Sequence, residues 1–370
     1  MTKPLLAAGL LAALCACGTP AQAGANPLVV TYDGGLYVLD GDRLTLSKDL
    51  PLPGFNRVNP AGDDRHVLVS TATGFRVLDA AAGELKADEF KAAEPGHVVR
   101  HAGKTVLFAD GSGVVTSFDP EKLGDGLPPV TTYTAAAPHH GVAVELAGGE
   151  LVVTLGTEKE RRGIAVLDAA RKEKARDESC PGVHGEATAQ GEAVVVGCEN
   201  GVLLYKDGVI RKIASPDRYG RIGNQAGSER SPIVLGDYKK DPRAELERPE
   251  QVSLIDTATG TMKLLNLGTS YTFRSLGRGP AGEGLVLGTD GRLHVIDPAA
   301  AKVVRSIPVL GAWSEPADWQ QPRPALFVRG GTAYVSDPAK RQVHAVDLAA
   351  GKTARSTTLP KPPNELSGVA

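Results

Sequence analysis

The chain has 370 residues, 42% of them hydrophobic and only 5% aromatic, and its 41 Lys and Arg nearly balance its 43 Asp and Glu. A formal net charge of −2 without a basic run argues against a nucleic-acid partner, because phosphate binding requires clustered Lys and Arg. The hydrophobic content is sufficient for a large core, which excludes a disordered chain.

The first residues predict an export signal. Lys3 precedes an apolar run over residues 5–14 that is too short to span a bilayer. Cleavage after Ala21-Gln22-Ala23 would remove residues 1–23, whereas Leu14-Cys15-Ala16-Cys17 resembles a bacterial lipobox, which would make a lipidated Cys17 the mature N-terminus. Both alternatives place the mature protein in the periplasm, and a membrane contact is expected only through the lipid anchor at Cys17.

Export also bears on the cysteines. Cys180 and Cys198 are the two that remain in the body of the chain, and a pair of cysteines in an oxidising compartment is expected to form a disulfide. A thiolate zinc site would normally show CxxC pairs, which this spacing does not provide. We therefore predict a Cys180–Cys198 disulfide.

A short strand that ends in Asp and is followed by a small-residue turn recurs along the chain. Its copies end at Asp40, Asp79, Asp119, Asp168, Asp207, Asp256, Asp297 and Asp347, the copy at Asp207 being the weakest. The average interval of about 44 residues is close to the length of a four-stranded propeller blade. Asp can accept hydrogen bonds from the turn that follows it, so these residues are predicted to be structural.

Short β-branched runs separated by turn residues lie between the copies, and no segment shows a long helical period. The sequence therefore predicts an all-β protein in which residues 24–370 form a single β-propeller of eight blades, or of seven if the copy at 203–207 is misread. Residues 28–50 contain only the later strands of a blade, and residues 364–369 resemble a lone inner strand. Pairing of these two terminal segments would close the ring.

Three histidines occupy matching places at the start of the predicted inner strands of three successive units. They are His97, His140 and His184. Because inner strands line the central channel of a propeller, the three imidazoles are expected to converge there. Three imidazoles can bind one Zn²⁺, although imidazole also serves copper, iron and nickel. The alternative is that these histidines hydrogen-bond channel carbonyls or water; we predict a zinc site.

A fourth ligand would be water or an oxygen atom. Glu186 lies two residues beyond His184 and by strand alternation faces the same side. Glu365 is expected on the opposite side of the ring. His139 would replace His140 if the register were shifted by one residue.

The remaining motifs carry less chemistry. His101 could contribute to a second site, whereas His66, His294 and His344 are predicted to be surface residues. The GxGxxG match at residues 277–282 has no helix after it and is predicted to be a hairpin turn. The charged stretch 237–250 is predicted to be a solvated loop, which could also dock a partner.

Several longer phrases are similar to the AztD family of periplasmic zinc metallochaperones, over nearly the whole mature chain. They are PLPGFNRVNP at 51–60, PHHGVAVE at 138–145, CPGVHGE at 180–186, GRIGNQAGS at 220–228 and WQQPRP at 319–324. This resemblance implies a β-propeller that binds zinc tightly and passes it to the solute-binding protein of a zinc ABC importer. It supports His140 and His184 directly. The chain has no His-rich stretch near its mature N-terminus, which puts a second or transfer site there in doubt.

We therefore expect a non-catalytic zinc carrier whose neutral imidazoles are replaced one by one by the ligands of a docked partner. One alternative is a propeller zinc hydrolase or lyase that uses the three-histidine site, with Glu186 as general base. Another is a metal-free scaffold for protein interactions.

Overall fold

The computed structural model describes residues 26–124 and 126–370. The predicted export signal over residues 1–23 and the lipobox cysteine Cys17 lie outside the described residues. Within the described part no helix is long and apolar enough to cross a membrane.

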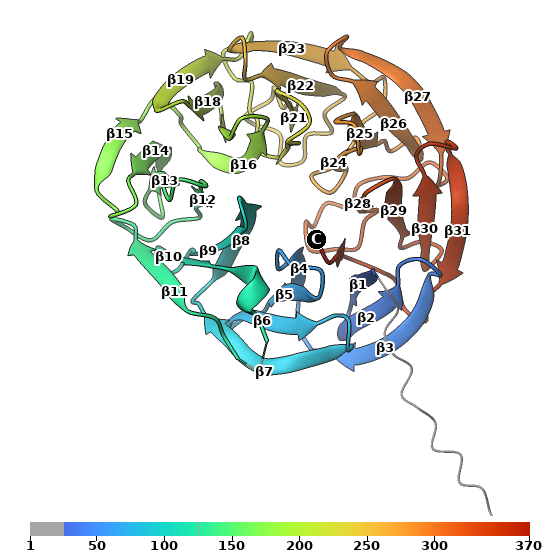
Figure 1. The fold of residues 1–370 in the computed structure, drawn as a ribbon. Helices are drawn as coiled ribbons and strands as arrows, with labels where there is room; N and C mark the ends of the chain where they lie inside the picture. Colours follow the sequence, from blue (N-terminus) through green and yellow to red (C-terminus); the bar gives the residue numbers. More distant parts are fainter. Residues whose placement is uncertain (1–25, 125) are drawn as a thin grey trace, which may run out of the picture.

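Eight four-stranded antiparallel sheets are arranged around a central channel as the blades of a propeller (Figure 1). Blade 1 contains β32 (Leu366–Gly368), β1 (Pro27–Tyr32), β2 (Gly35–Asp40) and β3 (Thr45–Pro51), and blade 2 contains β4 (Arg57–Pro60), β5 (His66–Ser70), β6 (Gly74–Asp79) and β7 (Glu84–Lys91). Blade 3 contains β8 (Pro95–His101), β9 (Lys104–Ala109), β10 (Val114–Phe118) and β11 (Val130–Thr134), with the short 3₁₀ helix η1 (Pro120–Lys122) after β10. Blade 4 contains β12 (Ala143–Glu145), β13 (Leu151–Gly156), β14 (Arg161–Leu167) and β15 (Glu173–Asp177).

The second half of the ring repeats this order. Blade 5 contains β16 (His184–Ala189), β17 (Ala193–Cys198), β18 (Gly201–Lys206) and β19 (Val209–Ala214), and blade 6 contains β20 (Gln225–Ala226), β21 (Ile233–Asp237), β22 (Gln251–Asp256) and β23 (Thr261–Asn266). Blade 7 contains β24 (Leu276–Arg278), β25 (Gly284–Leu287), β26 (Arg292–Asp297) and β27 (Lys302–Pro308), and blade 8 contains β28 (Leu326–Arg329), β29 (Thr332–Asp337), β30 (Gln342–Asp347) and β31 (Lys352–Thr358). The first strand of each blade in this order is the inner one.

The repeated Asp marks the end of the third strand in every blade, so the prediction of eight blades is confirmed. At seven copies the carboxylate accepts backbone N–H groups of the following turn, as when Asp40 accepts from Asp42 and Arg43 at 2.9 Å each. The weak copy differs in its backbone: Asp207 and Gly208 both have positive φ, +51° and +79°. This is the two-residue hairpin turn that Asp-Gly favours, and it explains why the usual small-residue turn is missing.

The ring is closed by the two ends of the chain, as predicted. Strand β32 pairs antiparallel with β1, with Val29 opposite Ser367, and the C-terminus lies near the centre of the ring (Figure 1). Backbone hydrogen bonds between Thr31 and both Asn364 and Glu365 extend this pairing. Blade 1 is therefore completed by a strand that is more than 330 residues away in sequence.

The hydrophobic core is divided among the interfaces between blades. Between blades 4 and 5, for example, Val144, Ile164, Val194 and Leu203 are all essentially inaccessible to solvent. Cys180 and Cys198 lie in this same cluster and form the predicted disulfide, with their Cα atoms 4.9 Å apart. The disulfide thus ties the segment before β16 to the end of β17.

Three histidines predicted to lie on the surface are instead buried, so this prediction was wrong: His66, His294 and His344 are only 2%, 5% and 7% exposed. His294 and His344 sit on third strands, opposite Ser306 and Ser356, whose hydroxyls bond their Nδ1 atoms at 2.9 and 2.7 Å. These hydroxyls satisfy one ring nitrogen of each histidine, which allows the rings to be buried.

Of the other two motif predictions, the hairpin turn is confirmed, and the solvated loop is confirmed over only part of the stretch 237–250. The GxGxxG match forms the turn between β24 and β25. The charged stretch is exposed over residues 240–245, although Asp237 and Tyr238 at its start are buried.

Candidate metal centre

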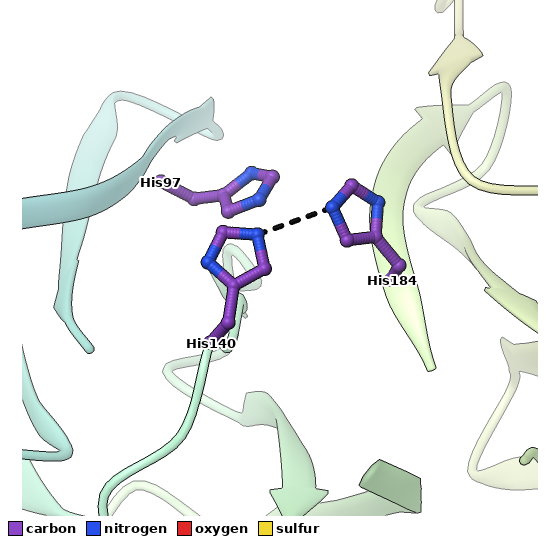
Figure 2. A group of neighbouring side chains, drawn as sticks. All are labelled: His97, His140 and His184. Carbon is purple, nitrogen blue, oxygen red and sulfur yellow. Dashed lines mark hydrogen bonds between the residues drawn. The ribbon is translucent and has the colours of Figure 1, made fainter. Parts of the chain in front are cut away.

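The three predicted imidazoles lie together, with their rings turned toward one another (Figure 2). His97 is on β8, His140 lies in the segment that leads into β12, and His184 is the first residue of β16, so the three come from blades 3, 4 and 5. Their ring centroids are 5.0–5.5 Å apart, and one potential ligand atom from each falls within 4.8 Å of the others. Within the residues that the structure describes, no other group of three His, Cys, Asp or Glu meets this criterion.

The Nε2 atoms of His140 and His184 face each other at 3.1 Å (Figure 2). Two nitrogens bound to one tetrahedral Zn²⁺ at about 2.0 Å would be roughly 3.3 Å apart, so this pair already has the separation that zinc requires. One ring nitrogen of His97 lies within 4.8 Å of the ligand atoms of the other two histidines, so the third imidazole is close to the same point. The donor set, three imidazoles without a thiolate, suits zinc.

Partners behind two of the rings fix which nitrogen points inward. Nδ1 of His140 lies 2.5 Å from Oδ2 of Asp110, and Nδ1 of His184 lies 2.6 Å from the carbonyl oxygen of Gly223. Because both acceptors favour a donating Nδ1–H group, each neutral ring has its lone pair on Nε2. The cluster is therefore held in the tautomer that can bind a cation.

The backbone around His184 is shaped for this contact. Gly185 has a φ of +69° and forms a β-bulge in the pairing of β16 with β17. A Cβ atom at Gly185 would lie 2.4 Å from the carbonyl oxygen of Gly223, so a larger residue would displace the group that orients His184. The Gly223 segment is itself fixed by Asp237, whose carboxylate accepts the backbone N–H groups of Gly223 and Asn224 at 2.7 and 3.0 Å.

Glu186 is near the cluster, but simple strand alternation does not explain its position, because the bulge inserts a residue between it and His184. Its Oε2 atom lies 3.7 Å from Nδ1 of His97, and the side chain also lines a cavity of about 320 Å³ in the channel. Burial raises the pKa of Glu186 to about 8. In the absence of a cation its carboxyl is therefore largely protonated at neutral pH.

Two of the imidazoles, those of His97 and His184, are held neutral by lowered pKa values. Burial, followed by the charges that His184 and His140 would carry, holds the pKa of His97 well below its usual range. Burial is also the main reason that the pKa of His184 is lowered to about 3. Since zinc binds only deprotonated imidazole, these two side chains need lose no proton to bind it at neutral pH.

Other candidate residues lie elsewhere. His139 is buried and turned into blade 4, where its Nδ1 and Nε2 atoms bond the carbonyl of Ala137 and the hydroxyl of Thr154 at 2.9 and 3.1 Å, so the register places His140 and not His139 in the cluster. Glu365 is engaged by Arg274 at 2.8 Å and by Arg57 at 3.3 Å.

At the far end of β8, His101 pairs with Glu192 at 3.1 Å. Among the described residues this pair gathers no third ligand.

Sequence reasoning missed the groups behind the cluster. Asp110 directly follows β9 in blade 3 and reaches His140 in blade 4, and Gly223 acts through a backbone carbonyl. An Asp also ends the second strand of blades 6 and 8, at Asp237 and Asp337, so the repeat pattern does not single out Asp110 as the partner of a histidine, and a backbone carbonyl carries no sequence signal.

Comparison with known proteins confirms the resemblance that the sequence phrases indicated. The chain is 27% identical to the zinc chaperone AztD of Citrobacter koseri over 285 residues, which cover 74% of this chain and 65% of the relative, just under two-thirds of its length. No family model matches the chain.

Solved structures confirm the fold. The structure of apo AztD from Citrobacter koseri superposes with a TM-score of 0.80 at 22% identity, covering 94% of this chain and 98% of that one. A second crystal structure of Citrobacter koseri AztD gives a TM-score of 0.78 at 22% identity, with 93% and 97% covered. The dihydro-heme d1 dehydrogenase NirN shares the architecture more distantly, with a TM-score of 0.62 at 15% identity over 94% of this chain and 76% of that one.

Proposed function

We propose that this protein is a periplasmic zinc carrier that binds Zn²⁺ through His97, His140 and His184 and delivers it to the solute-binding protein of a zinc ABC importer. The observation that carries the proposal is the convergence of three imidazoles from adjacent blades, with ligand atoms within 4.8 Å of one another. The likeness to a protein named as a zinc chaperone supports the same function. The Cys180–Cys198 disulfide fits an oxidising compartment such as the periplasm.

The site is arranged to bind zinc before the ion arrives. The Nε2 atoms of His140 and His184 are oriented by Asp110 and Gly223 before any metal arrives, so little side-chain order must be gained on binding. Three protein ligands leave one position of a tetrahedral zinc open. A fourth group can therefore enter without first displacing a histidine.

Release uses the same open position. The side chain of His140 is 43% exposed, so it is the member of the trio that solvent and a docked protein can reach most easily. A ligand from the partner would occupy the fourth position and then replace His140, while the more enclosed His97 and His184 are exchanged later. Such stepwise exchange passes the ion on without releasing it to solvent.

We do not propose catalysis, although a three-histidine zinc with an open position is a known catalytic arrangement. The matched relatives bear the name of a chaperone. A metal-free scaffold is disfavoured because it gives no reason for three pre-oriented imidazoles.

The proposal is tested by zinc competition against a chromophoric chelator, with the H97A, H140A and H184A variants. Each is expected to bind zinc at least roughly 10-fold more weakly, because one of three metal bonds is lost. H101A is the matched control, since His101 lies on the same strand as His97 but pairs only with Glu192. Equal zinc affinity and stoichiometry in all four variants would rule out this site.

Delivery requires a separate experiment. The zinc-loaded protein is mixed with the metal-free solute-binding protein in the presence of excess chelator, and the zinc content of each protein is measured over time. Direct transfer predicts that the acceptor gains zinc despite the chelator. If the chelator intercepts all of the zinc, the carrier function toward this partner is wrong.

A further inference from the structure

The Cys180–Cys198 disulfide adjoins one of the three proposed zinc ligands. Cys180 begins the segment CPGVH, which ends at His184. This segment lies between β15 and β16, and Gly182 within it has a φ of +61°. The backbone in front of His184 is therefore outside the ladder of strand hydrogen bonds, and its position depends on other contacts.

Cys198 lies between the backbone that carries His184 and the backbone that orients its ring. On one side, the preceding residue Gly197 pairs with His184 in the ladder of β16 and β17. On the other side, the carbonyl of Cys198 accepts the N–H of Ile222 at 3.0 Å. Ile222 is followed by Gly223, whose carbonyl oxygen lies 2.6 Å from Nδ1 of His184.

Three chain segments thus lie side by side at this place: 180–184, 197–199 and 220–223. Glu199, in the middle segment, donates its N–H to the carbonyl of Pro181 at 2.9 Å and accepts the N–H of Gly220 at 2.9 Å. A Cβ atom at Gly197 would overlap the carbonyl oxygen of Ile222, so the middle and third segments are in close backbone contact. The disulfide is the covalent link between the first segment and the middle one.

The other two histidines are positioned by different groups. His97 lies within β8, and the ring of His140 is held by the carboxylate of Asp110. Both residues belong to other blades than Cys198. Loss of the disulfide should therefore act on the zinc site through His184.

Both cysteines are 0% exposed, in the core between blades 4 and 5. Thiol–disulfide exchange requires that a thiolate reach one of the sulfurs, so the bond in the folded protein is protected from reduction. It is therefore formed during folding and then retained. Its formation joins the two sulfurs and transfers two electrons and two protons to a disulfide oxidant of the compartment, which becomes a dithiol.

We propose that the Cys180–Cys198 disulfide positions His184 for zinc, so that the three-histidine site reaches its full affinity only in the oxidised protein. This inference rests on the proposed zinc binding and adds a condition to it. Without the bond, the segment in front of His184 can move relative to Gly223, and the ring loses its orientation. Tight zinc binding then begins after export to an oxidising compartment, and the newly made chain in a reducing one binds zinc weakly.

The test compares zinc affinity of wild type and C180A/C198A by chelator competition. Alanine is used because free thiols could bind zinc themselves. The affinity of folded C180A/C198A should be lower by roughly tenfold or more, as is usual when a group that orients a metal ligand is lost. V335A is the control for general destabilisation, since Val335 is buried between blades 7 and 8; it should lower the melting temperature and leave zinc affinity unchanged.

A double-mutant cycle identifies the ligand through which the disulfide acts. In the H140A background, removal of the two cysteines should weaken zinc binding by a factor similar to that in wild type. In the H184A background it should have no effect, because the ligand that the disulfide positions is already absent. An equal loss in both backgrounds would show that the disulfide acts on overall stability.

A second measurement retains both cysteines and so does not depend on the folding of C180A/C198A. The protein is treated with the phosphine reductant TCEP, which becomes its oxide, and the new thiols are alkylated and counted by mass spectrometry. Bound zinc fixes His184 and with it the segment that must open before the disulfide can be attacked. Saturating zinc should therefore slow reduction several-fold in wild type and in H140A, but not in H184A.

Failure of this inference is distinguishable from failure of the proposed function. If wild type binds zinc but C180A/C198A binds it equally well, or if zinc does not slow the reduction of wild type, the positioning role is wrong and zinc carriage stands. If wild type does not bind zinc, the proposed function fails and the positioning role fails with it.

Discussion

The Nε2 atoms of His140 and His184 lie 3.1 Å apart although the residues are separated by 44 positions and belong to different blades. Each ring is held from behind, one by the Asp110 carboxylate and the other by the Gly223 carbonyl. The pair is therefore positioned by interactions that do not depend on a metal, which makes the effect of each supporting group measurable on its own.

The neighbouring histidines His139 and His140 should give opposite results when replaced. H140A removes an exposed ring from the cluster, so zinc affinity should fall while stability changes little. H139A removes a buried ring with two hydrogen bonds and should cost about 1–3 kcal/mol of unfolding free energy, while zinc affinity is retained. Urea unfolding and chelator competition on both variants measure the two effects; weaker zinc binding in H139A than in H140A would mean that the register is shifted.

Replacement of Asp110 should weaken zinc binding without removing a metal ligand. In D110N the amide can present its NH₂ group to Nδ1 of His140, so the ring is no longer held in the Nδ1–H tautomer, and zinc affinity should drop by roughly 10–100-fold. D168N is the control, because it makes the same chemical change at an Asp that lies in an exposed turn of blade 4, away from the histidines. Equal zinc affinity of D110N and wild type would show that His140 is oriented by packing alone.

Acid should destabilise the zinc-free protein through His184. The pKa of this imidazole is about 3 in the folded state against about 6.5 in an unfolded chain, so between these values the unfolded chain binds a proton that the folded one does not. The unfolding free energy must then decrease as pH falls through this window. Melting temperatures from pH 7 to pH 4 should fall less steeply in H184Q; parallel curves would contradict the lowered pKa.

Glu186 should make the zinc-free protein less stable as the pH rises, which is opposite to the effect of His184. Its pKa is raised to about 8 in the folded protein from a usual value of about 4.5, so the folded state holds the extra proton between these values, and stability should decrease as pH rises through them. E186Q should flatten this decline from pH 6 to pH 9 in the zinc-free protein. Since the two effects oppose each other between about pH 4.5 and 6.5, the variants must be measured separately, and no change of slope in E186Q would show that its carboxyl is already ionised.

The sequence repeat was sufficient to predict the propeller fold and the three-histidine cluster. It was not sufficient to predict side-chain contacts between blades. The strand-ending Asp residues mark third strands, and the spacing of His97, His140 and His184 follows from one residue position per blade. Asp110 could not be found in this way, because its contact with His140 crosses a blade interface and occurs once. A periodic sequence pattern predicts the features that all blades share. The side chain that orients His140 belongs to one blade interface, so the pattern does not predict it.

The same limit explains the misplaced residues. The sequence predicts His294 and His344 on the surface, yet both are buried, because serine hydroxyls opposite them bond their Nδ1 atoms. The predicted place of Glu365 in the ring made it a possible zinc ligand. Its carboxylate instead forms ion pairs with Arg274 and Arg57, which lie in other blades.

The ion pair of Glu365 with Arg274 should therefore serve ring closure and not metal binding. Both side chains are less than 10% exposed, and Glu365 directly precedes the strand that completes blade 1. E365Q leaves the Arg274 charge buried without its anionic partner, so the unfolding free energy should fall by about 3–5 kcal/mol, the usual cost of breaking a buried pair. E173Q is the control: the ion pair of Glu173 with Arg176 is nearly half exposed, and its loss should cost no more than about 1 kcal/mol.

Zinc affinity of folded E365Q should equal that of wild type. A loss of zinc affinity comparable to that of H140A, with little change in stability, would instead assign Glu365 to the metal and leave the closure of the ring to the backbone pairing of β32 with β1.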